Sequence, residues 1–176
     1  MQRSTATRAL SRPTRRTEKE AMIFFDDIDV GTRTEHGSVT VTREEIIDFA
    51  TKYDPQPFHL SDEAAAMTPF GKIAASGWNT CALTMRVLVD SWKEQQAMGL
   101  GSPGLDELRW LKPVYPGDTL HVASEVVEKK PSRSKPHIGS MWSDILVTNQ
   151  HGELVLKFRS IVMMLRKTAG APQLDA

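Results

Sequence analysis

Residues 77–98 have the sequence GWNTCALTMRVLVDSWKEQQAM, the longest helical pattern in the chain and the one that decides its architecture. Its first four turns contain few polar residues and are dominated by tryptophan, cysteine, leucine, methionine and valine. A helix that is apolar on nearly every side is a buried helix. The pattern therefore predicts one long central helix, ended by Gly99, with the rest of the chain wrapped around it.

Short segments of alternating hydrophobicity supply the material that would wrap this helix. The predicted strands cover residues 105–111, 120–126, 138–147 and 153–166, and an earlier one contains Val39 and Val41 after a His36-Gly37 turn. The sequence Asn149-Gln150-His151-Gly152 predicts a hairpin between the last two strands. We therefore expect an α+β domain in which four or five antiparallel strands form a sheet curled around one helix.

Two short helices are predicted upstream. Thr42 and Glu45 form a capping box, and apolar residues at helical spacing then predict a helix over residues 43–53. Pro55 ends this helix, because the residue before a proline is pushed out of the helical region. Asp54 is therefore expected to project into an irregular loop. A second short helix is predicted from Ser61 through Met67.

The segment Asp54-Pro55-Gln56-Pro57-Phe58-His59 places a carboxylate and an imidazole five residues apart, in a stretch that two prolines hold off helical geometry. Ser76-Gly77 follows at the start of the long helix, whose unpaired N–H groups can hold an anionic oxygen. These are the groups needed to move a proton and a water molecule beside a polarised carbonyl.

Composition limits the function classes. The chain has 176 residues, 40% of them hydrophobic, and a formal net charge of zero, which predicts one globular domain with no electrostatic attraction to nucleic acid or membrane. Cys81 is the single cysteine, so an internal disulfide is excluded and a cytoplasmic location is expected. Its place in an apolar run favours a core residue over a nucleophile. The histidines have no metal-site spacing, and no glycine-rich nucleotide loop is present.

The ends of the chain are predicted to lie outside the domain. Residues 1–21 contain five arginines and no acidic residue before Glu18. This composition resembles a mitochondrial or other organellar transit peptide. The alternatives are a disordered basic tail, or an upstream start codon with Met22 beginning the functional protein. We predict a disordered extension over residues 1–21, a domain over residues 22–168 and a flexible tail over residues 169–176.

Three motifs resemble the MaoC-like dehydratase family, which includes the (R)-specific enoyl-CoA hydratases and has the hot-dog fold. They are Tyr53-Asp54-x-x-Pro57-Phe58-His59, Phe70-Gly71-Lys72-Ile73-Ala74-Ala75-Ser76-Gly77 and Pro113-Val114-Tyr115-Pro116-Gly117-Asp118. The resemblance covers roughly residues 24–166. It departs from the family at Gln56, where Asn or Asp is common, and at Ser76, where many members have His.

The resemblance implies reversible hydration of a trans-2-enoyl-CoA to an (R)-3-hydroxyacyl-CoA, a reaction of fatty acid metabolism. Asp54 and His59 would hold one water molecule and act as the acid–base pair, and the N–H of Gly77 would bind the thioester oxygen. Glycine at position 77 is expected to leave room for the thioester. The family further implies a homodimer or a dimer of dimers, with acyl-CoA near the interface and no cofactor besides the CoA of the substrate.

The remaining candidate residues are expected to bind substrate: Pro57, Phe58, Ser76 and Trp78 near the acyl group, and Arg133 and Lys135 at the phosphates of CoA. Each has a structural alternative. Asp54 and His59 taken singly could be a loop aspartate and a satisfied histidine, and Ser76 an ordinary N-cap. Trp78 and Met85 could be core residues, and the loop of Arg133 a solvated turn.

Two other functions remain open at this level. A hot-dog acyl-CoA thioesterase would also use a carboxylate and a helix N-terminus, but has no need of His59 at this spacing. A non-catalytic acyl-CoA-binding subunit would be expected to lack the Asp or the His, and both are present.

Overall fold

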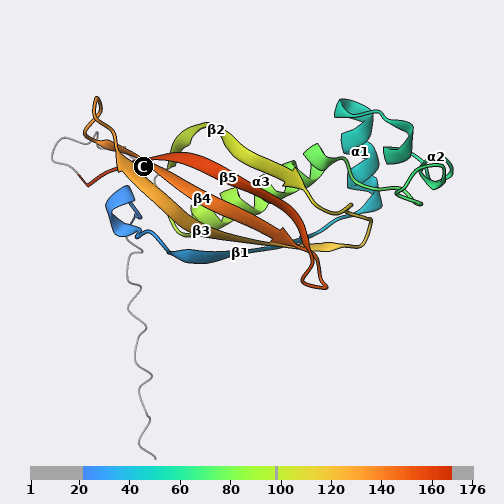
Figure 1. Cartoon of the computed structure of the whole chain (residues 1–176), viewed down its shortest axis with the longest axis horizontal. Helices are drawn as coiled ribbons and strands as arrows, with labels where there is room; N and C mark the ends of the chain where they lie inside the picture. The colour runs from blue at the N-terminus through green and yellow to red at the C-terminus, as the bar shows by residue number, and fades with distance from the viewer. Residues whose placement is uncertain (1–21, 98, 168–176) are drawn as a thin grey trace, which may run out of the picture.

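The computed structural model describes residues 22–97 and 99–167. Five antiparallel strands form one sheet in the order β1-β3-β4-β5-β2, and the sheet curls around helix α3 (Gly77–Glu94) (Figure 1). The α+β architecture predicted from the sequence is confirmed. The strands are β1 (Arg33–Thr40), β2 (Gly99–Trp110), β3 (Thr119–Pro131), β4 (Ile138–Thr148) and β5 (Leu154–Leu165).

The core lies between one face of α3 and the sheet. Leu88 of α3 is 1% exposed, and it belongs to one cluster with fully buried strand residues such as Leu120, Ile145 and Leu156. Alternation along the strands places these side chains on the face toward the helix. The core therefore fixes α3 lengthwise along the sheet.

Helix α3 differs from the prediction in two ways. It ends at Glu94 rather than near residue 98, and Gln96 already has a positive φ of 52°. Only one face is buried within the single chain, because Trp78 is 58% and Met85 is 42% exposed. Polar residues lie on the buried face instead, where Thr84 is fully buried and donates a hydrogen bond from Oγ1 to the carbonyl of Thr80.

Two strands also differ from the prediction. Strand β2 begins at Gly99, six residues before the expected start at residue 105, and pairs with β5 through several register shifts. As an edge strand it tolerates Pro103 and three bulges. His36-Gly37 is a bulge within β1 rather than a turn before it: the register with β3 shifts between Glu35 and Gly37, and Gly37 has a φ of 116°.

The other elements agree with the sequence. Helix α1 (Arg43–Tyr53) has the predicted Thr42–Glu45 capping box, and helix α2 (Asp62–Ala66) is capped by Ser61. The β4–β5 hairpin closes through the backbone hydrogen bond from Asn149 to Glu153. Helices α1 and α2 lie beyond one end of the sheet, beside the N-terminus of α3 (Figure 1).

The predicted extension over residues 1–21 and the predicted tail over residues 169–176 lie outside the described residues, so these boundaries remain predictions. Within residues 22–97 and 99–167, no helix is long and apolar enough to cross a membrane.

Candidate active site

Asp54 and His59 lie on a short irregular segment between α1 and α2. Asp54 follows the last residue of α1 with a non-helical φ of −150° and ψ of 67°, as Pro55 requires. Pro57 then begins a single 3-10 turn, Pro57–His59, whose end turns the imidazole inward. His59 is only 5% exposed. The two prolines thus have a structural role, which is to bring residues 54 and 59 to the same side of the loop.

The Asp54 carboxylate accepts two side-chain hydrogen bonds. Ser76 Oγ donates to Oδ2 at 2.6 Å, and Gln56 Nε2 donates to Oδ1 at 2.8 Å. These donors, the serine hydroxyl first, hold the pKa of Asp54 below its ordinary value of 3.8, helped by the charge of His59 and opposed by partial burial. Both donors stabilise the anion, so Asp54 is ionised at neutral pH.

The imidazole of His59 has a fixed orientation. Nδ1 lies 2.7 Å from the carbonyl oxygen of Ala74, which only accepts, so Nδ1 carries hydrogen. Nε2 faces Asp54 Oδ2 at 3.5 Å. In the neutral ring Nε2 is an acceptor, and so is the carboxylate. A donor placed between them, such as one water molecule, satisfies both groups.

The N-terminus of α3 lies beside this pair because Ser76 belongs to both. Its side chain accepts from the N–H of Trp78 at 3.3 Å while it donates to Asp54. Among the described residues, the N–H of Gly77 has no hydrogen-bond partner. A fixed backbone donor at the positive end of an 18-residue helix therefore lies one residue from the side chain that binds the carboxylate.

The structure gives a different reason for glycine at position 77 from the one expected. A Cβ atom there would lie 2.5 Å from Cε2 of Trp110, and the indole Nε1 donates to the Gly77 carbonyl at 2.8 Å. The space beside the α-carbon is thus filled by Trp110 and is not left open for a thioester. Trp110, at the end of β2, was not identified from the sequence, because nothing local links it to residue 77.

The predicted acyl-group residues lie in different surroundings. Phe58 packs edge-on against His59, with ring centroids 4.5 Å apart, and lies beside the pair. Pro57 begins the 3-10 turn. Trp78 is exposed and packs edge-on against Trp110 with 5.4 Å between centroids. The core alternative for Trp78 is therefore wrong within the single chain, and its contact with substrate remains a prediction.

Arg133 and Lys135 do not lie near this site in the same chain. Both occupy the hairpin between β3 and β4, at the far end of β3. The Asp54 end of the molecule is tied to the other end of that strand, since the N–H of Ala75 bonds the carbonyl of Val114 at 2.8 Å. Thirteen residues of strand separate the two ends, which is roughly 40 Å. Within one chain Arg133 and Lys135 therefore lie far from Asp54, and their contact with the phosphates of CoA remains a prediction.

One further polar group near the helix N-terminus stands out. Asn79 is 4% exposed, and its Oδ1 atom is buried without a hydrogen-bond partner among the described residues. Nothing in the sequence pattern indicated this residue, because asparagine in an apolar helical run has no characteristic spacing. Over residues 22–97 and 99–167, no group of three His, Cys, Asp or Glu side chains is arranged to hold a metal ion.

The sequence matches the family model described as a MaoC like domain over residues 27–141. The chain is 29% identical over 153 residues to a 3-hydroxybutyryl-CoA dehydratase of Methylorubrum extorquens, covering 86% of this chain and 90% of that protein.

Solved structures show the same relationship. A MaoC-like dehydratase from Rhodospirillum rubrum superposes with a TM-score of 0.75 at 38% identity, over 84% of this chain and 99% of that one. A Mycobacterium tuberculosis protein with a double hotdog fold superposes with a TM-score of 0.70 at 19% identity. The superposed region spans 86% of this chain and 46% of that protein, so this chain has the fold of one hot-dog unit.

Proposed function

The chain belongs to the family of MaoC-like domains, and we propose that it is a hydro-lyase that adds water reversibly to a trans-2-enoyl-CoA, giving an (R)-3-hydroxyacyl-CoA. The observation that carries this proposal is the placement of His59 Nε2 3.5 Å from Asp54 Oδ2, next to the N-terminus of α3. The relative from Methylorubrum extorquens, a 3-hydroxybutyryl-CoA dehydratase, supports the reaction class. The (R) configuration is taken from the family.

Asp54 and His59 would divide the proton transfers between them. A water molecule that donates one hydrogen to each acceptor is held with its oxygen lone pairs directed away from both, toward C3 of a bound enoyl group. Asp54, kept ionised by Ser76 and Gln56, takes the proton as the oxygen attacks. That proton would then pass from Asp54 Oδ2 to His59 Nε2, 3.5 Å away, and the imidazolium would deliver it to C2, which returns both groups to their starting states. The Nδ1–H bond to Ala74 holds the ring in the orientation needed.

Negative charge develops on the thioester oxygen during this attack. The N–H of Gly77 would donate to that oxygen, and the α3 dipole would favour the charge. Trp110 supports the donor, because its bond to the Gly77 carbonyl fixes the first peptide units of the helix. Such a donor is worth about 3–4 kcal/mol of transition-state stabilisation in other enzymes.

The proposed substrate is an acyl-CoA thioester, and the proposed reaction uses no cofactor besides the CoA that the substrate carries. We further propose that the chain acts as a homodimer or a dimer of dimers. Exposed apolar side chains on α3 and on the edge strand β2 support this assembly, among them Met85, Leu105 and Trp110. In such an assembly Arg133 and Lys135 would meet only a CoA bound at the partner's site.

The test is a set of enoyl-CoA thioesters of increasing chain length, with loss of the enoyl absorbance as the signal and chiral analysis of the product. We expect hydration without release of CoA. Release of free CoA thiol at a rate equal to substrate loss would instead establish the thioesterase alternative. Binding of every thioester with no turnover of any would establish the non-catalytic alternative.

A further inference from the structure

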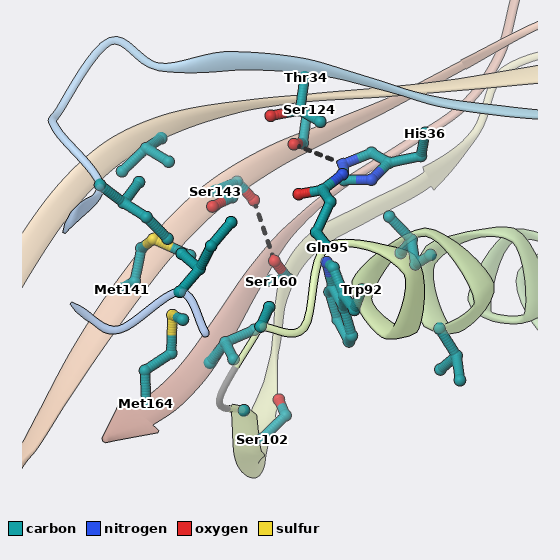
Figure 2. Close-up of a pocket in the computed structure, with 18 of the residues that line it drawn as sticks. Thr34, His36, Trp92, Gln95, Ser102, Ser124, Met141, Ser143, Ser160 and Met164 are labelled. Carbon is teal, nitrogen blue, oxygen red and sulfur yellow. Dashed lines mark hydrogen bonds between the residues drawn. The ribbon is translucent and has the colours of Figure 1, made fainter. Parts of the chain in front are cut away.

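Asn79 of α3 is buried with an acceptor that no group in the described chain satisfies. It is 4% exposed, and its Oδ1 atom has no hydrogen-bond partner among the described residues. Burial of an acceptor without a donor costs stability. The cavity at the other end of α3, with His36 and Trp92 on its wall, does not include Asn79 (Figure 2). The donor for Oδ1 therefore has to come from a molecule that binds near the N-terminus of the helix.

Helix geometry directs Asn79 toward the Asp54–His59 pair. Asn79 follows Ser76 by three residues, which is about 4.5 Å along the axis, and positions three apart share one face of a helix. Side chains of a helix lean toward its N-terminus, so the amide of Asn79 is directed back over the first turn, toward Ser76. Ser76 Oγ itself lies 2.6 Å from Asp54 Oδ2. Asn79 is therefore the next buried polar side chain after Ser76 on the face that holds the pair.

The neighbouring donors already have partners. Ser76 donates its hydroxyl hydrogen to Asp54, and the hydroxyl of Thr80 donates to the carbonyl of Ser76 at 3.4 Å. The Nδ1–H of His59 is bonded to a backbone carbonyl. Among the described residues, this side of the site therefore offers three acceptors, which are Asp54 Oδ2, His59 Nε2 and Asn79 Oδ1. A water molecule has two hydrogens, so the attacking water leaves one of the three acceptors without a donor.

The dehydration direction of the proposed reaction shows which group fits the third acceptor, and the inference rests on that proposed function. His59 Nε2 takes the proton from C2 as the C2=C3 double bond forms, so it cannot also accept the hydroxyl hydrogen. The proton passes to Asp54 Oδ2, which gives it to the hydroxyl oxygen as the C3–O bond breaks and water leaves. Oδ2 therefore faces that oxygen as a donor. The hydrogen already on the hydroxyl then has to point to a third acceptor.

We propose that Asn79 is a specificity-determining residue of this site, and that its Oδ1 atom accepts the hydrogen of the 3-hydroxyl group in the productive complex. The contact turns a lone pair of the hydroxyl oxygen toward Asp54, where the proton arrives. An enoyl group has no hydroxyl, so the contact is absent from the enoyl-CoA complex and forms only as water adds. The site therefore favours a hydroxyl as leaving group over a group of similar size that carries no hydrogen.

The test compares hydroxyl and fluorine as leaving groups on the full chain. An (R)-3-hydroxyacyl-CoA and the 3-fluoroacyl-CoA of the same chain length and configuration give the same enoyl-CoA, and the gain of enoyl absorbance follows both reactions. Fluorine leaves as fluoride with the C3–F electron pair, while the C2 proton goes to His59. Fluorine is close to a hydroxyl in size but has no hydrogen to donate to Asn79.

Asn79→Ala removes the acceptor. We expect kcat/KM for the 3-hydroxyacyl-CoA to fall roughly five- to tenfold, the effect of one hydrogen bond, and kcat/KM for the 3-fluoroacyl-CoA to stay at the value of the parent. In the hydration direction, KM for the enoyl-CoA should stay unchanged while kcat falls by the same factor, because the contact is made only as the hydroxyl forms. A general disturbance of the helix would not produce this division between kcat and KM.

Two further variants separate the contact from packing. Asn79→Leu keeps the branched shape of the side chain without its polar atoms, and it should show the same selective loss even where Asn79→Ala is too unstable to assay. Thr84→Val is the matched control. It removes a hydroxyl from the same buried face of α3, and that hydroxyl donates to the carbonyl of Thr80. The ratio of the two kcat/KM values, hydroxyl over fluorine, should be unchanged in Thr84→Val.

The outcomes distinguish this inference from the function on which it rests. An active parent whose ratio is unchanged in Asn79→Ala and Asn79→Leu would overturn the inference and leave the proposed hydratase function intact. An equal loss with both thioesters would also overturn it, because Asn79 would then support the helix without contacting the leaving group. A parent that converts neither thioester, and hydrates no enoyl-CoA, would overturn the proposed function and the inference with it.

Discussion

The two ends of α3 each hold a histidine in a hydrogen-bonded cluster, and the two clusters differ in charge. At the N-terminal end, His59 faces the carboxylate of Asp54 at 3.5 Å. At the C-terminal end, His36 lies between the hydroxyls of Ser91 and Ser124, with no carboxylate bonded to it. A carboxylate stabilises imidazolium and makes proton transfer feasible, whereas two hydroxyls only orient a neutral ring. The same residue type therefore has surroundings suited to proton transfer at one end of the helix and to a buried neutral ring at the other.

The largest expected effect comes from replacing either residue of the Asp54–His59 pair. Asp54→Asn and His59→Gln should each lower kcat by about 10²–10⁴-fold, because each removes one partner of the proton transfer. Steady-state kinetics on an enoyl-CoA that the parent hydrates well measures this, with circular dichroism to verify the fold. His36→Gln is the matched control at the other end of the helix and should retain most of the turnover. Near-parental turnover in either variant of the pair would remove that residue from the mechanism.

The next largest effect is expected at Gly77, a residue with a packing contact and a proposed role in catalysis. Gly77→Ala places a Cβ against Trp110, and overpacking of this kind costs about 1–3 kcal/mol of stability. We expect a lower Tm and a lower kcat/KM. Gly77→Ala with Trp110→Ala should recover part of the stability, because the clash is gone.

Kinetics on that double variant separates the two roles of the position. The backbone N–H is still present, so recovery of kcat/KM together with Tm indicates that the glycine is needed for the contact with Trp110. Recovered stability without recovered activity would instead mean that the substrate side of residue 77 tolerates no side chain, or that Trp110 itself supports the reaction.

The sequence predicted the Asp54–His59 pair far better than the contacts of His36, for a physical reason. Asp54 and His59 are five residues apart, and two prolines fix the loop between them, so their proximity is a local property. The contacts of His36 with Ser91 and Ser124 join residues separated by 55 and 88 positions, which only the completed sheet brings together. His36-Gly37 was predicted as a turn because a glycine bulge inside a strand has the same local signal.

Long-range contact also explains where the structure differs from other expectations. The apolar pattern of residues 77–98 predicted a helix buried on every side, but a single chain covers only one face, and Trp78 and Met85 stay exposed. Arg133 and Lys135 were assigned to CoA from their charge alone, which carries no information on position. The length of β3 then separates them from Asp54.

A smaller effect is expected for Ser76, and it tests whether this residue lowers the pKa of Asp54. Ser76→Ala removes the hydroxyl that does most to lower the pKa of Asp54, so that pKa should rise. Since the base acts when ionised, the acidic limb of kcat/KM against pH should move to higher pH. At the most acidic pH of the profile, we expect a loss of roughly tenfold, typical of a hydrogen bond to a charged group. Gln56→Ala should move the limb in the same direction by less, and an unmoved limb in Ser76→Ala would contradict this role.

The smallest expected effect is on stability, and it tests whether the cluster at the C-terminal end is neutral. The pKa of His36 in the folded chain is below the 6.5 of the ordinary side chain. As the pH falls, the imidazole therefore gains a proton in the unfolded chain before it does so in the folded chain. Stability from the buried neutral ring is therefore present above pH 6.5 and is lost as the pH falls below it. His36→Gln lacks this loss. Between pH 7.5 and pH 5.5 its Tm should fall by less than that of the parent, by a few degrees at most, and thermal melts at the two values measure the difference.

His151→Gln is the control for an exposed histidine and should follow the parent. An equal fall in His36→Gln and the parent would mean that the ring gains a proton in the folded chain without cost, which would contradict a buried neutral ring.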